Sequence, residues 1–386
     1  MTNSNPGGKP APSTVYHLGS QHAGLTLAAA LKELVPNTSW STAKQWIAKR
    51  QVQVNGNLCL DEARRVTEKD VVKLFEQPLP RPVAPNDLRI VHLDEHLLVV
   101  EKPAGVTSVR HVAERKLSTR RRQLQPTLEE LLPPLLAKLQ HLRWPPLPPL
   151  GMNKGKKVGG PKFKQPLGIH NAKKLPPELQ VIAVHRLDRD TSGLMLFART
   201  RVAEQKLTNM FRRHTINREY VAVCLGHVAA GTIESRLVRD RGDGVRGSHV
   251  ATVAVKQATE PTETSDMDNS DADSPAGDRA VTHIVSAEHF VAGTPEQAYS
   301  LIRCRLETGR THQIRIHLSE AGHMLCGDKI YFRNAQGALT HDSSGAPRHA
   351  LHSDSLSFTH PVTGQHLKFT MPMPHDLAKW LKKLRT

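Results

Sequence analysis

Strand-like segments fill much of the second half of the chain, but helices do not alternate with them in a regular order. β-branched residues or polar–apolar alternation favour strands in four segments: Tyr220–Leu225, Ala251–Val255, Ala280–His289 and Ala298–Leu306. Helical spacing is present in three segments: Arg201–Phe211, Thr311–Ala321 and Asp376–Leu384. A regular alternation of strands and helices would indicate a parallel α/β sheet. Its absence predicts an α+β domain.

A separate small domain is predicted ahead of this region, over residues 15–77. Its predicted elements are helices over residues 25–34 and 41–47 and strands over residues 52–56 and 70–74. The first of these strands ends in Asn55-Gly56, the strongest short signal for a hairpin. Residues 1–14 are rich in Gly, Pro and Ser and are predicted to be disordered.

The proline-rich residues 78–85 are predicted to link this small domain to a larger one over residues 86–386. A strand pair, Leu88–Leu93 and Leu97–Glu101, is expected at the start of the larger domain. Two segments of opposite charge are predicted as insertions in it. The first, about residues 110–174, is basic, with a helix expected around Leu128–Leu142. The second, about residues 257–279, is acidic and is predicted to be a disordered loop that stays away from RNA.

Positive charge predominates over the whole chain, with 53 Lys and Arg against 36 Asp and Glu and a formal charge of +17. Such an excess suits a polyanionic partner. The four cysteines are scattered without a CxxC spacing, which argues against a disulfide framework or a zinc ribbon. No run of apolar residues is long enough to span a membrane, and the N-terminus does not resemble a secretory signal. We therefore expect a cytoplasmic protein.

Charged residues gather first in His185-Arg186-Leu187-Asp188-Arg189-Asp190, a short turn between apolar, strand-like sequences. One interpretation is a solvated ion-pair turn. The other is a functional site, because charges at the edge of a buried sheet shift pKa values and cluster at such sites. These six residues alone leave both interpretations open.

The second charged cluster follows the last predicted strand, from Leu306 to His317. Gly309 is expected to make a turn and Thr311 to cap the helix that follows. His312 and His317 are five residues apart and have no third ligand at metal spacing, so no metal site is predicted. The segment also carries two guanidinium groups, which can keep a neighbouring carboxylate ionised or bind phosphate.

Taken together, these segments resemble the RluA family of RNA pseudouridine synthases. The resemblance rests on motifs that occur in the family's order: EKPAG at 101–105, HRLDRDTSGLMLFA at 185–198, REYVAV at 218–223, LETGRTHQIRIHLSEAGHMLCGDKIY at 306–331 and RHALH at 348–352. It covers about residues 86–380 outside the two insertions. The resemblance implies a catalytic domain with a mixed, largely antiparallel central sheet.

The same resemblance assigns roles to individual residues. Asp188 matches the catalytic aspartate, Tyr220 the aromatic residue that packs on the uracil, and Arg315 the basic partner of the aspartate. Arg186 matches the arginine that helps to displace the target base, and Arg310 is a candidate for RNA binding. The reaction breaks and remakes a glycosidic bond, so it requires neither a cofactor nor a metal. Whether the aspartate acts as nucleophile or as base stays open.

The N-terminal segment resembles the S4-like RNA-binding domain that many members of this family carry. Its candidate RNA-binding residues are Lys44, Lys49 and Arg50. It departs from the usual pattern at Leu25-Thr26-Leu27 and at Ser39-Trp40-Ser41-Thr42, where basic residues are missing. The fold is expected here, while RNA binding by this domain is an open question.

These observations predict a monomeric isomerase that converts uridines of large-subunit ribosomal RNA to pseudouridine. A synthase acting on transfer RNA is one alternative. A non-catalytic RNA-binding or ribosome assembly protein would also explain the charge, but it would not need the aspartate, tyrosine and arginine together. A base-excising glycosylase or a hydrolase could use one aspartate, yet neither class accounts for the ordered motifs.

Overall fold

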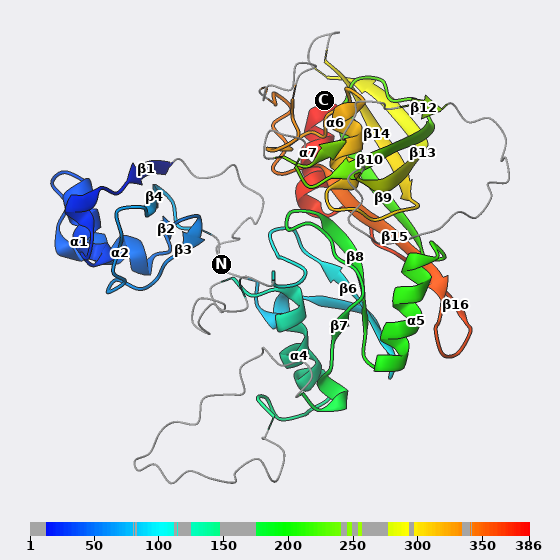
Figure 1. Cartoon of the computed structure of the whole chain (residues 1–386), viewed down its shortest axis with the longest axis horizontal. Coiled ribbons are helices and arrows are strands. Elements are labelled where there is room, and N and C mark those ends of the chain that lie inside the picture. The colour runs from blue at the N-terminus through cyan, green and yellow to red at the C-terminus, as the bar shows by residue number, and fades with distance from the viewer. Residues whose placement is uncertain are drawn as a thin grey trace. The chain divides into compact units, whose positions relative to one another are not determined.

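A computed structural model (Figure 1) describes residues 13–79, 81, 83–111, 114, 125–146, 175–240, 245–248, 254–256, 277–292, 297–333, 340 and 342–386. The chain forms two compact units, the first of which takes in the described residues up to Val83 together with Gln125 and Pro126, and the main boundary falls between Val83 and Ala84. This boundary falls inside the segment that was predicted to be a linker. Among the described residues, no helix has the length and apolar character needed to cross a membrane.

The smaller unit is a four-stranded sheet with two α-helices. Its elements are β1 (Ser13–His17), the 3₁₀ helix η1 (Ser20–His22), α1 (Leu27–Leu34), α2 (Trp40–Ala48), β2 (Val52–Val54), β3 (Asn57–Leu58) and β4 (Val71–Phe75), with strand order β1-β4-β2-β3. Thr26 and Ser39 cap the two α-helices, because each side chain accepts a hydrogen bond from the first helical turn. Buried side chains from both helices and from β2 and β4 form the core of this unit.

The predicted elements of this unit are confirmed, but its start is not. Strand β1 pairs with β4 from Ser13↔Phe75 to His17↔Val71. Ser13 and Thr14 therefore belong to a strand, and the prediction that residues 1–14 are all disordered is wrong at these two positions. Their composition gave no strand signal, because the strand forms through pairing with a segment about 60 residues away in sequence.

A mixed, largely antiparallel sheet of twelve strands organises the larger unit, as predicted. Its strands are β5 (Arg89–Leu93), β6 (Leu97–Lys102), β7 (Ile182–Ala183), β8 (Ser192–Ala198), β9 (Asn217–Leu225), β10 (Gly231–Val238), β11 (Gly247–Ser248), β12 (Ala254–Lys256), β13 (Asp278–Val291), β14 (Ala298–Leu306), β15 (Leu351–Thr359) and β16 (His366–Thr370). Only the β8–β15 pair is parallel among the described strands. It joins the β5–β6 hairpin to the antiparallel run β9-β14-β13-β10.

Helices pack against this sheet (Figure 1). They are the 3₁₀ helices η2 (Pro85–Asp87) and η5 (Pro177–Leu179) and the α-helices α4 (Leu128–Leu139), α5 (Arg201–Arg212), α6 (Gln313–Glu320) and α7 (His375–Leu384). The amphipathic faces of α5 and α7 enter two separate clusters of the core. The predicted helices at the positions of α4, α5, α6 and α7 are all confirmed.

Two predictions about the insertions require correction. Arg110 is buried and forms a two-pronged ion pair with Glu130 of α4, a helix whose leucines are buried except Leu139 at its end. This part of the predicted basic insertion is therefore a packed element of the larger unit. Asp278 and Arg279 start β13 and pair with β10, so the acidic segment ends before them. Residues 112–113, 115–124 and 147–174 of the first predicted insertion and residues 257–276 of the second lie outside the described residues.

Candidate active site

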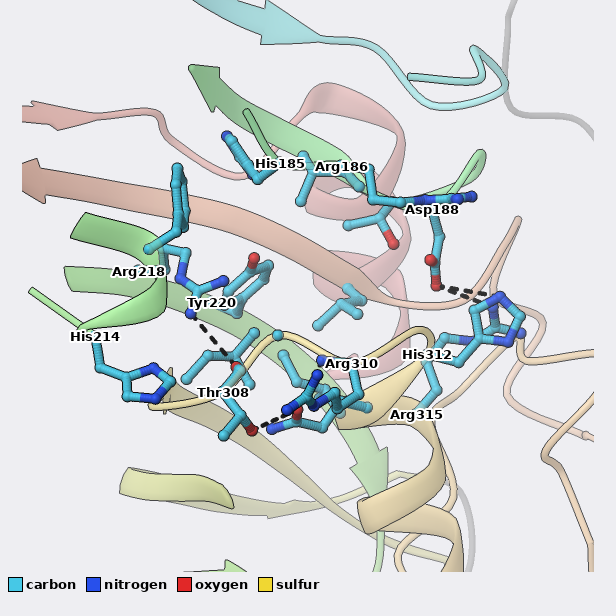
Figure 2. Close-up of a pocket in the computed structure, with 18 of the residues that line it drawn as sticks. His185, Arg186, Asp188, His214, Arg218, Tyr220, Thr308, Arg310, His312 and Arg315 are labelled. Atoms are coloured by element: carbon cyan, nitrogen blue, oxygen red, sulfur yellow. Dashed lines mark hydrogen bonds and ion pairs between the residues drawn. The ribbon is translucent and has the colours of Figure 1, made fainter. Parts of the chain in front are cut away.

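A cavity of about 390 Å³ opens where the two charged clusters of the sequence meet β9 (Figure 2). This volume lies within the range of small-ligand sites. Five predicted site residues line it: Arg186, Asp188, Tyr220, Arg310 and Arg315. The fold therefore joins segments that are far apart in the sequence.

Asp188 lies in the turn between β7 and β8, with its carboxylate partly exposed to the cavity. The Arg315 guanidinium donates from Nη1 to Asp188 Oδ2 at 3.1 Å. The His312 Nε2 atom lies 3.8 Å from the same oxygen. A cation therefore stands beside the candidate catalytic carboxylate on one side, while its other side faces the cavity (Figure 2).

Arg315 has a second carboxylate partner that the sequence analysis did not identify. Its Nε and Nη2 atoms donate to the two oxygens of Asp328 at 2.6 and 3.0 Å, in the two-pronged geometry of a strong ion pair. Burial would lower the pKa of Arg315, but the hydrogen bond and charge of Asp328, followed by those of Asp188, raise it above its ordinary value. Burial would raise the pKa of Asp328, but Arg315 lowers it. Asp328 therefore holds the guanidinium in the orientation in which its third nitrogen meets Asp188.

His312 replaces Thr311 as the N-cap residue of α6, and the prediction of a Thr311 cap is wrong. Its backbone is left-handed, with φ of 61°, and its side chain does not cap the helix. Instead, its Nδ1 atom shares a hydrogen bond of 2.9 Å with the Tyr331 hydroxyl. Burial lowers the pKa of the His312 imidazole, while the Asp188 carboxylate opposes this shift. The left-handed turn directs the ring toward Asp188 rather than along the helix (Figure 2).

Buried groups hold the backbone on both sides of Asp188. The Ser108 hydroxyl accepts from Leu187 N at 3.0 Å and donates to Leu187 O at 2.6 Å. The fully buried Lys102 ammonium donates to the carbonyls of Arg189 and Thr191, and burial lowers its pKa to about 7 while Asp190 opposes the shift. Arg348 Nη1 donates to the Asp190 carbonyl at 2.9 Å. The turn is therefore fixed before any substrate binds.

Tyr220 extends from β9 into the wall of the cavity and is 5% exposed. Burial raises the pKa of its hydroxyl, while the neighbouring Arg218 guanidinium opposes that shift. The hydroxyl is therefore neutral, and the ring presents an aromatic surface in the same cavity as Asp188 (Figure 2). An aromatic face in such a position can stack on a nucleic-acid base.

The remaining predicted residues divide between the two units. Arg186 is exposed, and Arg310 is half-buried and donates to the Arg279 carbonyl at 3.1 Å. Lys44, Lys49 and Arg50 belong to the smaller unit and do not line the cavity. Lys44 pairs with Glu62 at 3.2 Å. Arg50 donates to the Leu79 carbonyl at 3.3 Å. Lys44 and Arg50 therefore each have a partner within the protein.

Polar groups near the cavity do not assemble into a metal site. Within the part of the chain that the structure describes, no three His, Cys, Asp or Glu side chains are grouped to hold a metal ion. His317, the second histidine of the cluster, is buried and shares hydrogen bonds with Ser235 and Thr282. Its role is to fasten α6 to β10 and β13.

Comparisons with known proteins agree with this geometry. The family model described as RNA pseudouridylate synthase matches residues 96–320, and the S4 domain model matches residues 26–72. A ribosomal large subunit pseudouridine synthase D from Zymomonas mobilis is 34% identical over 97% of this chain and 98% of its own. Proteins with the same name from Escherichia coli O157:H7 and Vibrio vulnificus are 29% and 30% identical over 94% of this chain and 91% of theirs. The chain therefore belongs to the RNA pseudouridylate synthase family, and it is an RluA-type enzyme with an S4 domain ahead of its catalytic domain.

Proposed function

We propose that this pseudouridine synthase acts on uridines of large-subunit ribosomal RNA, with Asp188, Tyr220 and Arg315 at its active centre. The observation that carries the assignment of residues is the contact of 3.1 Å between Arg315 and the one carboxylate that lines the described cavity. The guanidinium holds the Asp188 carboxylate in position, and the reaction uses that carboxylate as nucleophile or base.

The chemistry follows from the position of this carboxylate. Asp188 either attacks the anomeric carbon of the ribose or removes the proton at its 2′ position, and the bond between N1 of uracil and C1′ then breaks. The freed base turns and its C5 atom bonds to C1′, after which the proton on C5 is lost. Both routes need a flipped-out nucleotide and a pocket that excludes water. The 390 Å³ cavity suits this requirement.

Tyr220 and Arg186 handle the base in this proposal. The Tyr220 ring lies in the cavity wall and packs on the flipped uracil. The exposed Arg186 side chain, two residues before Asp188, fills the space that the base leaves in the RNA stack. Arg310 and the surface lysines supply phosphate contacts that position the RNA without reading its sequence.

The choice of ribosomal RNA rests on the relatives. Those that match nearly the whole of this chain are named ribosomal large subunit pseudouridine synthase D. The S4 domain, with Lys44, Lys49 and Arg50, is the second RNA contact in this proposal. We further propose that the enzyme works in the cytoplasm as a monomer.

Mapping pseudouridines in ribosomal and transfer RNA from cells with and without this gene tests the substrate. We expect sites in large-subunit ribosomal RNA to disappear without the gene and to return with the parent sequence. The Asp188→Asn sequence should not restore them. Disappearance of transfer RNA sites alone would reassign the substrate.

A further inference from the structure

Arg218 is a buried arginine in the cavity wall that meets no carboxylate among the described residues. It is 7% exposed and lies two residues before Tyr220 on β9. Its Nη2 atom donates only to backbone carbonyls, those of Glu307 and Thr308, at 3.3 and 3.4 Å. Its Nε atom is buried and has no hydrogen-bond partner. A buried charged group without a counter-charge costs free energy, so a buried arginine with these partners needs an explanation.

Three of the other buried arginines of the larger unit differ in this respect. Arg110 meets Glu130, Arg315 meets Asp328, and Arg348 meets Asp376, each with two hydrogen bonds to carboxylate oxygens. Their charges are neutralised within the protein. A fourth, Arg199, also donates to backbone carbonyls, those of Asp94 and Glu178, and its Nε atom also has no partner, but it does not line the cavity. Arg218 does line the cavity, so a ligand bound there can bring the counter-charge that Arg218 lacks.

Close packing holds the Arg218 guanidinium in place. The Phe211 ring lies 5.3 Å from its central carbon. A Cβ at Gly309 would lie 2.7 Å from Nη1, so the absence of a side chain at Gly309 lets the guanidinium lie against this loop. The guanidinium is thus confined between an aromatic ring and a loop of the cavity wall. Such a fixed donor stabilises charge that develops during a reaction, because it does not have to reorganise.

The position of Arg218 relative to Asp188 suggests which part of the substrate it meets. Figure 2 shows Tyr220 between Arg218 at one end of the site and Asp188 at the other. With the ribose at Asp188 and the uracil on Tyr220, the base edge furthest from the sugar reaches Arg218.

We propose that Arg218 binds the carbonyl edge of the flipped uracil and stabilises the negative charge that the base acquires when it leaves the ribose. As the N1–C1′ bond breaks, its electron pair passes to N1 and is shared with O2 and O4 of the ring. The new C5–C1′ bond then takes up an electron pair of the base, and the C5 proton departs. This proposal rests on the pseudouridine synthase activity and adds a catalytic residue to it.

The burial of Arg218 favours the base over a backbone phosphate as its partner. Phosphates of the RNA stay at the surface, where the exposed Arg186 is available. The guanidinium can only donate hydrogen bonds. It therefore suits the oxygen acceptors of uracil and not the amino group of cytosine, which is itself a donor. Arg218 would therefore contribute to the choice of base as well as to the rate.

Single-turnover measurements on Arg218→Met, Arg218→Lys and the control Arg305→Met test this proposal. Arg305 lies on β14, exposed and outside the cavity lining, so its variant controls for the removal of one positive charge. The target RNA carries either uridine or 5-fluorouridine, and consumption of the target nucleoside reports cleavage of the glycosidic bond. Fluorine stabilises the departing base anion, so the cleavage step needs less help from Arg218.

We expect Arg218→Met to slow the uridine reaction about 100- to 1,000-fold, with RNA affinity and its salt dependence unchanged. The defect should be at least about tenfold smaller on 5-fluorouridine, because that base needs the charge-stabilising donor less. Arg218→Lys should fall between parent and Arg218→Met, and Arg305→Met should match the parent. Circular dichroism checks folding. If Arg218→Met does not fold, Arg218→Lys decides by the same comparison of the two RNAs.

Equal defects on uridine and 5-fluorouridine RNA would overturn the proposal, because a merely structural residue does not sense the leaving group. Weaker RNA binding with a flatter salt dependence would overturn it in favour of a phosphate contact. If the parent enzyme makes no pseudouridine on any RNA tested, the underlying activity fails rather than the role of Arg218.

Discussion

Asp328 shows how a residue outside the predicted site controls a residue inside it. It lies 13 positions after Arg315, across the end of α6, and is 3% exposed. Its two oxygens hold two nitrogens of Arg315, which leaves the third for Asp188. Arg315 would otherwise be free to rotate away from the candidate catalytic carboxylate.

Replacing Asp328 with Asn should therefore reduce both stability and activity. Breaking a buried ion pair leaves one charge uncompensated, and we expect the free energy of unfolding to decrease by about 3 kcal/mol. The single-turnover rate should fall as well, because Arg315 is no longer held in its orientation. Denaturant unfolding and the rate of pseudouridine formation measure the two effects. Parental values of both would contradict the assigned role of Asp328.

Motif residues were easier to predict than the residues that hold them. Asp188 and Arg315 stand in motifs whose chemistry is visible in the sequence, and the structure places them in contact. Lys102 and Arg218 also stand in motifs, but whether their side chains are buried depends on segments that are distant in the sequence. Lys102 meets carbonyls nearly ninety residues later in the chain. A sequence gives no direct measure of such distant packing.

At the scale of elements, α6 carries a buried histidine whose protonation opposes folding. His317 is fully buried between Ser235 and Thr282, and burial lowers its pKa from 6.5 to about 4. As the pH falls, the unfolded chain therefore binds a proton at this residue at a higher pH than the folded chain does. The stabilisation is complete above about pH 6.5 and disappears as the pH falls toward about 4.

We expect the free energy of unfolding of the parent to decrease as the pH falls through this window. His317→Asn should show a shallower decrease, since one group that takes up a proton on unfolding has been removed. The exposed His366→Asn variant serves as the control and should keep the parental slope. Urea unfolding at several pH values provides the measurement. Equal slopes for parent and His317→Asn would refute the assignment.

Elements with local signals were predicted, and those that depend on distant pairing were not. Periodic leucines indicated α1, and polar–apolar alternation ending in a hairpin signal indicated β2. Strand β1 forms only because β4 returns beside it. Residue preference predicted Thr311 as the N-cap of α6. Hydrogen bonds in the preceding turn determine where the helix starts instead, because Gln313 Oε1 accepts from Arg310 N and from Thr308 Oγ1. Those bonds place His312 in the left-handed conformation at the helix start.

At the scale of the whole molecule, the basic character of residues 147–174 is the clearest feature whose role is unassigned. This segment has seven lysines and no acidic residue. Deleting all of residues 110–174 would also remove α4 and its buried pair with Arg110, so a narrower change is needed. Replacing the seven lysines by Gln keeps the length and removes only the charge.

This charge-free variant should bind RNA more weakly and with a flatter dependence on salt, because each bound phosphate releases counterions. We expect the slope of log affinity against log salt to become shallower by roughly 0.7 to 0.9 for each phosphate that the variant no longer binds. Filter binding at several salt concentrations measures it. An unchanged slope would mean that the segment is a spacer or a protein-binding arm.

We propose that one carboxylate, Asp188, performs the chemistry in this cavity. The most direct test is the single-turnover yield of pseudouridine from Asp188→Asn, with deamidation back to Asp excluded by mass spectrometry. Folding and RNA affinity should be nearly those of the parent, because the side chain is partly exposed and its shape is kept. We expect no detectable pseudouridine from this variant. Product formation at a rate near that of the parent would contradict it.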